Sequence, residues 1–180
     1  MDKIIITNED YNKLGITLIP IKNHISIKQS IIDSIKKMGI HSKIDDAQSI
    51  ANTDWHLNSN VLRLYHNDIN NIMNTVCETM HNALNVPQAL NIKNYWFQQY
   101  KEKDFHTWHT HGNCIFSAIY YVDLDNKCSR TTFRLLNGSE FSLNVKEGDV
   151  LVFPSYMPHT SKPNLSNKTK TIVSFNMDAA

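Results

Sequence analysis

The sequence predicts a mainly β protein, an antiparallel sandwich or barrel preceded by two helices. Short apolar or aromatic stretches follow one another closely from residue 91 onward, which is typical of antiparallel sheets and not of alternating β and α units. The turns between them carry Asn137-Gly138 and Glu147-Gly148-Asp149, as hairpins often do. Two earlier stretches have apolar residues at helical spacing, so we expect these helices to buttress the outer face of the sheet.

Composition is that of an ordinary soluble globular protein. The 180 residues are 41% hydrophobic and 19% charged, which suits one domain over 1–180, with a helical N-terminal support in 1–90 and a β core in 91–180. The formal net charge of +1 gives no field that favours nucleic acid or an anionic membrane surface. No apolar stretch approaches the roughly 20 residues that span a membrane.

Cysteine usage and the N-terminus both point to a cytoplasmic protein. Cys77, Cys114 and Cys128 form an odd, scattered set without a Cys-x-x-Cys pair, which argues against a disulfide framework and suits a reducing compartment. The N-terminal apolar run is too short for a signal peptide.

The first part of the chain predicts extended pieces and one helix. Residues 3–7 and 15–21 read as extended, and Pro20 places the second piece at an edge. Ser26 followed by Gln29 resembles a capping box. Apolar residues then recur at helical spacing up to Gly39, where a helix would stop: Ile27, Ile31, Ile35 and Met38.

A second helix is predicted from about Asp68 to Leu84, after an irregular stretch over 40–58. Its apolar face faces the sheet, and comprises Ile69, Ile72, Met73, Val76, Met80 and Leu84. His66 and His81 read as surface or cap histidines. The strands expected after it cover 95–100, 114–122, 131–136, 141–145, 150–153 and 171–175.

A histidine motif carries the most specific chemical signal. In an extended strand His109 and His111 would point to the same face, with Cα atoms about 6.6 Å apart, and neutral imidazole is a common metal ligand. His159, which follows an apolar strand and a proline, is the best third ligand. In the same strand His106 and Trp108 would point to the face opposite to His109, so His106 is not included among the metal ligands. With nine histidines in the chain, a His-x-His pair alone more often marks surface residues.

The order of several motifs resembles the iron(II)- and 2-oxoglutarate-dependent dioxygenase superfamily, in particular a small branch with a His-x-His…His pattern. Tyr100 precedes His109 by nine positions, and Gly148-Asp149-Val150-Leu151-Val152-Phe153-Pro154 leads to His159. Lys170 and then Ser174-Phe175-Asn176 follow. The matched region covers roughly residues 50–178.

The resemblance implies a double-stranded β-helix, or jelly roll, that holds Fe(II) through His109, His111 and His159. Most of the superfamily has Asp or Glu as the middle ligand, so His111 departs from the general pattern and leaves the iron centre one unit more positive. Asn113 paired with His111 is an alternative ligand pair, although the spacing from Tyr100 favours His109.

The resemblance also implies that 2-oxoglutarate is the co-substrate, with its far carboxylate on a cation about ten residues after the distal histidine. Lys170 stands there where relatives usually carry Arg, and a lysine lacks the two-pronged guanidinium. Ile172 replaces a serine of the pattern, and Tyr100 or Ser174 could compensate. The competing interpretation makes Lys170 a solvated residue of the Lys168-Thr169-Lys170 run.

The implied activity is oxidative decarboxylation of 2-oxoglutarate coupled to hydroxylation of a small-molecule or peptide substrate, inside a pocket that Trp108 and Phe97 could wall. Two other classes stay open. The spacing from Gly148 to His159 also resembles a cupin motif, and a cupin dioxygenase with three histidines would not need 2-oxoglutarate. A non-catalytic jelly-roll module would use the histidines structurally or to bind zinc.

Overall fold

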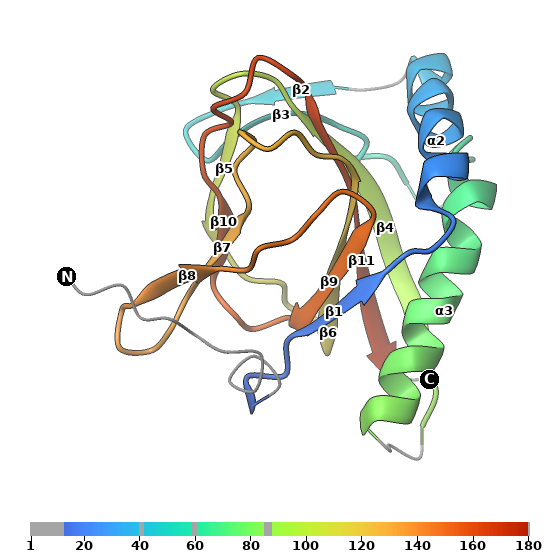
Figure 1. The fold of residues 1–180 in the computed structure, drawn as a ribbon, viewed down its shortest axis with the longest axis vertical. Helices are drawn as coiled ribbons and strands as arrows, with labels where there is room; N and C mark the ends of the chain where they lie inside the picture. Colours follow the sequence, from blue (N-terminus) through green and yellow to red (C-terminus); the bar gives the residue numbers. More distant parts are fainter. Residues whose placement is uncertain (1–12, 40–41, 59–60, 85–87, 180) are drawn as a thin grey trace.

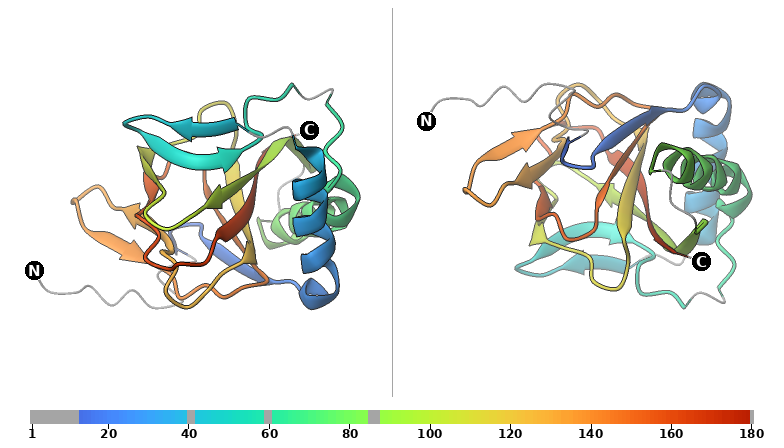
Figure 2. Two further views of the ribbon diagram at one scale, coloured as in Figure 1. Left: turned by 90° about the horizontal axis from the view of Figure 1, so that it is seen from above. Right: turned by 90° about the horizontal axis from the view of Figure 1, so that it is seen from below.

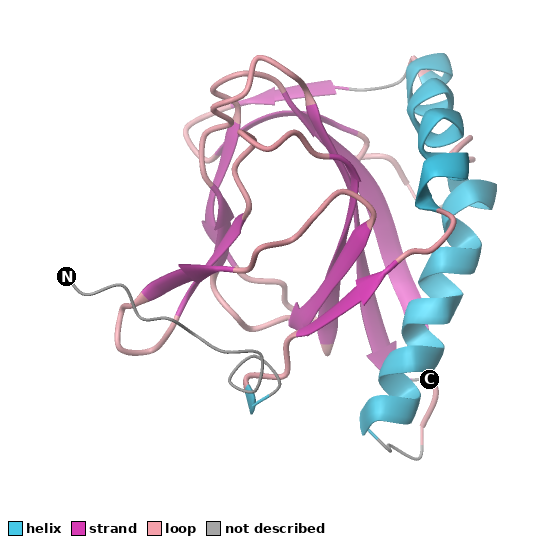
Figure 3. Ribbon diagram, viewed as in Figure 1, coloured by secondary structure: helices cyan, strands magenta, loops and turns pink. Residues whose placement is uncertain are grey.

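The chain forms a curled antiparallel sheet with two helices on one side (Figures 1 and 3). The computed structural model describes residues 13–39, 42–58, 61–84 and 88–179. Across the sheet the strands follow the order β1-β9-β6-β11-β4-β3-β5-β10-β7-β8, and β2 pairs with β3. This is a jelly-roll, double-stranded β-helix fold, as expected.

Three strands come from the first half of the chain: β1 (Thr17–Pro20), β2 (Ser42–Asp45) and β3 (Ser49–Thr53). β1 pairs only with β9, so the expected edge position is confirmed within the described sheet. The prediction of irregular structure over 40–58 is wrong, because β2 and β3 form a hairpin there. The inward positions of β3 are Ser49, Ala51 and Thr53, so the strand lacks the apolar alternation that marks most strands. The stretch 3–7 lies outside the described residues.

The second half supplies the remaining described strands: β4 (Leu90–Tyr100), β5 (Phe105–His109), β6 (Phe116–Asp123), β7 (Thr131–Arg134), β8 (Glu140–Ser142), β9 (Asp149–Pro154), β10 (His159–Ser161) and β11 (Lys170–Ala179). The predicted series corresponds to β4, β6, β7, β8, β9 and β11, whereas β5 and β10 lie outside it. β8 is shorter than the predicted 141–145.

The helices that the described residues form are α2 (His24–Met38) and α3 (His66–Leu84), and each begins earlier than predicted. The capping box at Ser26 is wrong: this residue lies inside the first turn of α2, where its hydroxyl donates to the Asn23 carbonyl at 2.7 Å. The predicted stop is confirmed, since Gly39 adopts a left-handed conformation with φ of 58°.

Both helices cover the outer face of the sheet, as the perpendicular views of Figure 2 show. Ile31 and Ile35 of α2 and Val76 of α3 belong to the same buried cluster as Phe97 of β4 and Val173 of β11. Burial of this apolar area is the main force that holds the helices to the sheet.

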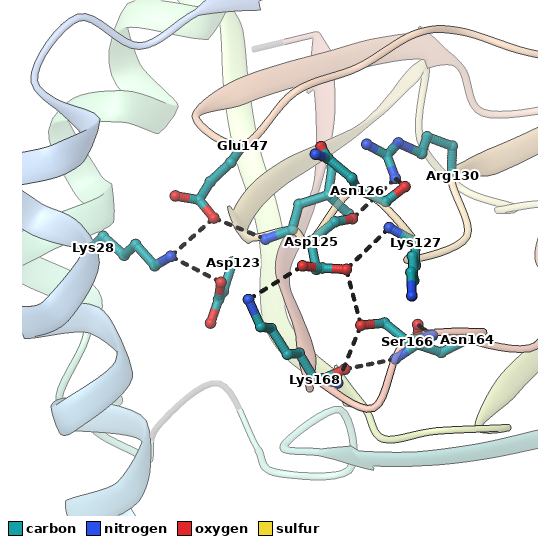
Figure 4. A network of polar contacts seen from close by, with 11 residues as sticks. Lys28, Asp123, Asp125, Asn126, Lys127, Arg130, Glu147, Asn164, Ser166 and Lys168 are labelled. Carbon is teal, nitrogen blue, oxygen red and sulfur yellow. Dashed lines mark hydrogen bonds and ion pairs between the residues drawn. The ribbon is translucent and has the colours of Figure 1, made fainter.

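A polar contact ties α2 to the sheet at its margin. The Lys28 ammonium donates to Asp123 at 2.8 Å and to Glu147 at 2.9 Å (Figure 4). Glu147 also accepts from the Leu124 N–H at 3.0 Å, and these contacts outweigh its partial burial, so that its pKa falls to about 2. In the described part of the chain no helix is long and apolar enough to cross a membrane.

Candidate metal centre

Three histidines meet inside the curl of the sheet, and two of them face each other across a strand pair. His109 ends β5, His159 begins β10, and the two are register partners. His111 lies two residues beyond β5, where its N–H donates to the Ser155 carbonyl at 2.9 Å. The strand therefore ends before His111, unlike the extended run predicted. One ring nitrogen from each of the three still lies within 4.8 Å of the others.

Backbone carbonyls fix the tautomer of two of these rings. The Nδ1 atom of His109 lies 2.8 Å from the Thr107 carbonyl, and that of His159 lies 2.9 Å from the Met157 carbonyl. A carbonyl only accepts, so in each ring Nδ1 carries the proton and Nε2 keeps its lone pair. Orientation by a backbone carbonyl is the usual second contact of a metal-binding histidine.

Burial keeps the imidazoles neutral. It lowers the pKa of His109 and, with the neighbouring His109, the pKa of His111 to about 4. Burial likewise holds the pKa of His159 well below its ordinary value. A neutral imidazole is the form that binds a metal ion, so the donor set fits a divalent cation that accepts nitrogen ligands.

A fourth histidine stands beside the three, contrary to the parity argument. Between β10 and β5, His159 faces His109 while Ser161 faces His106. Two steps on β10 therefore match three on β5, which is a β-bulge. The bulge turns His106 to the same side as His109, and their rings stack with centroids 3.9 Å apart.

An inner cavity opens beside the three histidines. The residues that line it include Trp96, Gln98 and Tyr100, which alternate along β4. Only Tyr100 of these was singled out from the sequence. Because alternate residues of a strand face the same side, the position of Tyr100 also predicts Gln98 as a lining residue. The amide nitrogen of Gln98 lies 3.4 Å from Nδ1 of His106. Ser174 and Ile172 also line the cavity.

Lys170 is buried beside the inner cavity, so the interpretation as a solvated lysine is wrong. Its residue exposure is 1%, and its ammonium donates to the Ser161 hydroxyl at 2.6 Å and to the Ser129 carbonyl at 3.1 Å. The same nitrogen lies 4.5 Å from the centre of the Tyr100 ring. Ser161 and Tyr100 both line the cavity, which places the cation directly behind its wall.

Three other residues considered from the sequence lie outside this cavity lining. Trp108 stacks under the Arg134 guanidinium at 3.9 Å, and Phe97 is fully buried in the cluster beneath the helices. Asn113 is exposed, with φ of 62°. The aromatic residues that line the cavity instead include Trp96, Tyr100 and Phe153.

Solved structures with this fold are known. A prolyl-4-hydroxylase from Pseudomonas putida has a TM-score of 0.70 and 12% identity, with 96% of this chain and 97% of that chain covered. A 2OG-Fe(II) oxygenase family oxidoreductase from Burkholderia pseudomallei has a TM-score of 0.76 and 10% identity, covering 94% and 88%. A viral collagen prolyl hydroxylase from Paramecium bursaria Chlorella virus-1, in complex with 2OG, has a TM-score of 0.66 and 15% identity. The match covers 92% of this chain and 96% of that chain.

These likenesses establish the fold, which agrees with the fold that the sequence motifs implied. No protein-family model matches the chain, and no curated protein matches it.

Proposed function

We propose that this protein is an Fe(II)-dependent oxygenase that couples oxidative decarboxylation of 2-oxoglutarate to hydroxylation of a second substrate. The observation that carries the proposal is that one cavity has a cluster of imidazoles and a buried ammonium beside it. Three neutral imidazoles converge at one part of it, and the buried ammonium of Lys170 lies behind its wall at Ser161 and Tyr100.

His109, His111 and His159 are the proposed ligands of the iron. If these three residues hold the ion, its other coordination positions would stay open for small molecules, as in non-haem iron oxygenases. Imidazole suits iron, but also zinc and copper, so the donor set alone does not choose the metal. Iron is favoured by the fold, because the similar structures include a 2OG-Fe(II) oxygenase family member.

Lys170, Tyr100 and Ser174 are the proposed residues of the 2-oxoglutarate site. A buried ammonium is costly to maintain and is stabilised by an anion that replaces its lost water. In this proposal Lys170 would pair with the far carboxylate of 2-oxoglutarate, and the histidines would hold the metal to which its keto-acid end binds. Tyr100 and Ser161 hold the ammonium in position, and Ser174 lies in the cavity wall.

When bound, iron and 2-oxoglutarate together supply the oxidising power that inserts one oxygen atom of O₂ into a C–H bond. The chain itself binds and orients both, and it restricts water access, because Trp96 and Phe153 wall the cavity. We infer a small molecule or a peptide as the substrate. One structure of similar fold, a prolyl hydroxylase from Trichoplax adhaerens, holds a peptide fragment of hypoxia inducible factor.

The all-histidine donor set favours one rival, an oxygenase of the cupin type that needs no 2-oxoglutarate. Anaerobic titration of the full chain with Fe(II) and then 2-oxoglutarate separates the two. The proposal predicts a visible metal-to-ligand charge-transfer band that saturates at one equivalent of each. H159A should abolish the band because it removes a metal ligand. K170M should still bind the metal but should bind 2-oxoglutarate more weakly. If the band is absent and a separate aerobic assay shows oxygen consumption that is independent of 2-oxoglutarate, the cupin type is favoured. Metal binding without the band and without oxygen consumption would favour a non-catalytic module.

A further inference from the structure

A second hollow, the outer vestibule, adjoins the inner cavity on the side of β2 and β3. It shares five lining residues with the inner cavity: Trp96, Gln98, His106, His109 and His111. The two hollows therefore meet at the candidate metal centre. A substrate that reaches the metal from the outside would contact the vestibule walls.

Two tryptophans form a corner of the vestibule. The rings of Trp55 and Trp96 lie 4.4 Å apart between centroids and are inclined at 75°. Trp96 is almost fully buried, whereas Trp55 is 49% exposed and remains available for contact. The edge contact with Trp96 holds the half-exposed Trp55 ring in place, and the negative face of an accessible indole attracts cations such as alkylammonium groups.

A carboxylate stands in the same vestibule. Asp46 lines it, and its Oδ1 accepts the N–H groups of Gln48 at 2.7 Å and Ser49 at 2.8 Å. The other oxygen, Oδ2, has no hydrogen-bond partner in the described part of the chain. The turn thus holds the carboxylate in place and leaves an acceptor for a ligand.

Asp46 gives the described lining of the vestibule a negative charge. None of the described residues that line it is Lys or Arg. Under the proposed function, Fe(II) and the 2-oxoglutarate dianion cancel in charge. Asp46 would then set the sign of the field that a substrate meets, and an unpaired positive group is the complement.

We propose that the outer vestibule binds the positively charged alkylammonium group of the substrate, between the Trp55–Trp96 corner and the Asp46 carboxylate. The inference deepens the proposed function by naming a substrate class, a lysine side chain or a free alkylamine, and it rests on that function for the chemistry that follows binding. Binding itself does not require iron.

The test is calorimetric titration of the full chain, treated with chelator and without 2-oxoglutarate. The probes are the capped amides Nα-acetyl-lysine, Nα-acetyl-norleucine and Nα-acetyl-glutamate N-methylamide, which differ mainly in side-chain charge. We expect the lysine amide to bind about tenfold more tightly than the norleucine amide, and the glutamate amide more weakly than either. Pentylamine as a fourth probe distinguishes a free amine from a peptide side chain, because only the latter needs the flanking amides.

Matched variants assign the preference to named groups. D46N keeps an oxygen for the two turn N–H groups but removes the charge, so it should erase most of the preference for lysine. D45N removes the same charge one residue away, outside the vestibule lining, and should preserve it. W55F should weaken lysine binding less than W55L, because only phenylalanine retains a π face.

Equal binding of the lysine and norleucine amides, a preference for glutamate, or no binding of any probe would overturn the inference. So would equal effects of D46N and D45N. These outcomes are independent of the anaerobic titration: a chain that binds lysine but shows no charge-transfer band keeps the vestibule and loses the oxygenase proposal.

Discussion

His106 and His109 stack face to face, with ring centroids 3.9 Å apart and planes inclined by 12°. A bulge in β5 produces this contact, because it brings two residues that are three positions apart to one side of the strand. His106 lines both the inner cavity and the outer vestibule. It therefore supports one proposed metal ligand and at the same time forms part of the path to the metal.

If the stack positions His109, its loss should weaken metal binding. H106A removes the supporting ring and should lower the affinity for Fe(II) by about tenfold, the lower end of what changes next to metal ligands cost. H106F keeps a flat ring of similar size and should retain most of the affinity. Competitive titration against a chromogenic chelator measures both. H81A, which removes an imidazole from the exposed side of α3, is the control, and equal affinity of H106A and H81A would contradict the argument.

The buried Lys170 makes stability depend on pH. Burial lowers its pKa from 10.5 to about 7. Between pH 7 and pH 10.5 the unfolded chain binds a proton there that the folded chain does not, so this residue makes the free energy of unfolding rise with pH across that window. Below pH 7 the folded protein bears the full cost of a buried charge.

K170M removes this cost and should be more stable than the natural sequence at pH 6, by about 2 kcal/mol. The advantage should shrink as the pH rises to 9.5. Urea unfolding at several pH values measures it. K168M, at a largely exposed lysine of the same run, should show neither effect. A constant difference between K170M and the natural sequence over this range would refute the assignment of the titrating group.

The same lysine should make 2-oxoglutarate affinity depend on pH. A carboxylate binds the ammonium form, so above pH 7 binding must take up a proton and the affinity should fall, by up to tenfold per pH unit. K170R carries a guanidinium that stays charged, and its affinity should be nearly level from pH 6.5 to 8.5. Anaerobic titration of the charge-transfer band at each pH measures both proteins, and parallel curves for the two would exclude Lys170 from the site.

Most strands of the second half can be predicted from the sequence because their inward positions are large and apolar, as in Phe116 to Asp123. Such a signal is absent from β3, whose inward residues are small or polar, and from the polar turn at Asp46 that positions the vestibule carboxylate. Strand alternation places His106 on the wrong side, since a bulge shifts this alternation and depends on pairing with a distant strand. The burial of Lys170 cannot be predicted from its neighbours in the sequence either, because its contacts come from Ser129 and Ser161, elsewhere in the chain.

His111 is the proposed ligand that departs from the pattern of the resembled superfamily, and its role can be tested by substitution. H111D restores the carboxylate that most of the resembled superfamily carries, and it makes the centre one unit more negative. We expect it to keep one equivalent of iron and to lower the Fe(III)/Fe(II) midpoint potential, since negative charge favours the ferric ion. H111A should instead lower metal affinity by at least about tenfold. Potentiometry and metal analysis distinguish the two variants, and an unchanged potential in H111D would remove His111 from the ligand set.

A buried ion pair fixes the loop that carries Trp55. The Asp54 carboxylate accepts from the Arg63 guanidinium at 2.9 Å, from the Tyr65 hydroxyl at 2.7 Å and from the Phe97 N–H at 2.8 Å. Asp54 is fully buried and Arg63 is 5% exposed. The pair therefore anchors the Trp55 loop to β4 at the start of the vestibule wall.

D54A should destabilise the protein by about 3–5 kcal/mol, because it leaves a buried guanidinium without its counterion. Urea unfolding measures the loss. The double variant D54A/R63L should cost less than the sum of its single changes, since it removes both charges together. E140A breaks exposed ion pairs with Arg134 and Lys162 and should have a far smaller effect, because solvent screens them. If D54A cost no more than E140A, the Asp54–Arg63 pair would not be what holds Trp55 in the vestibule.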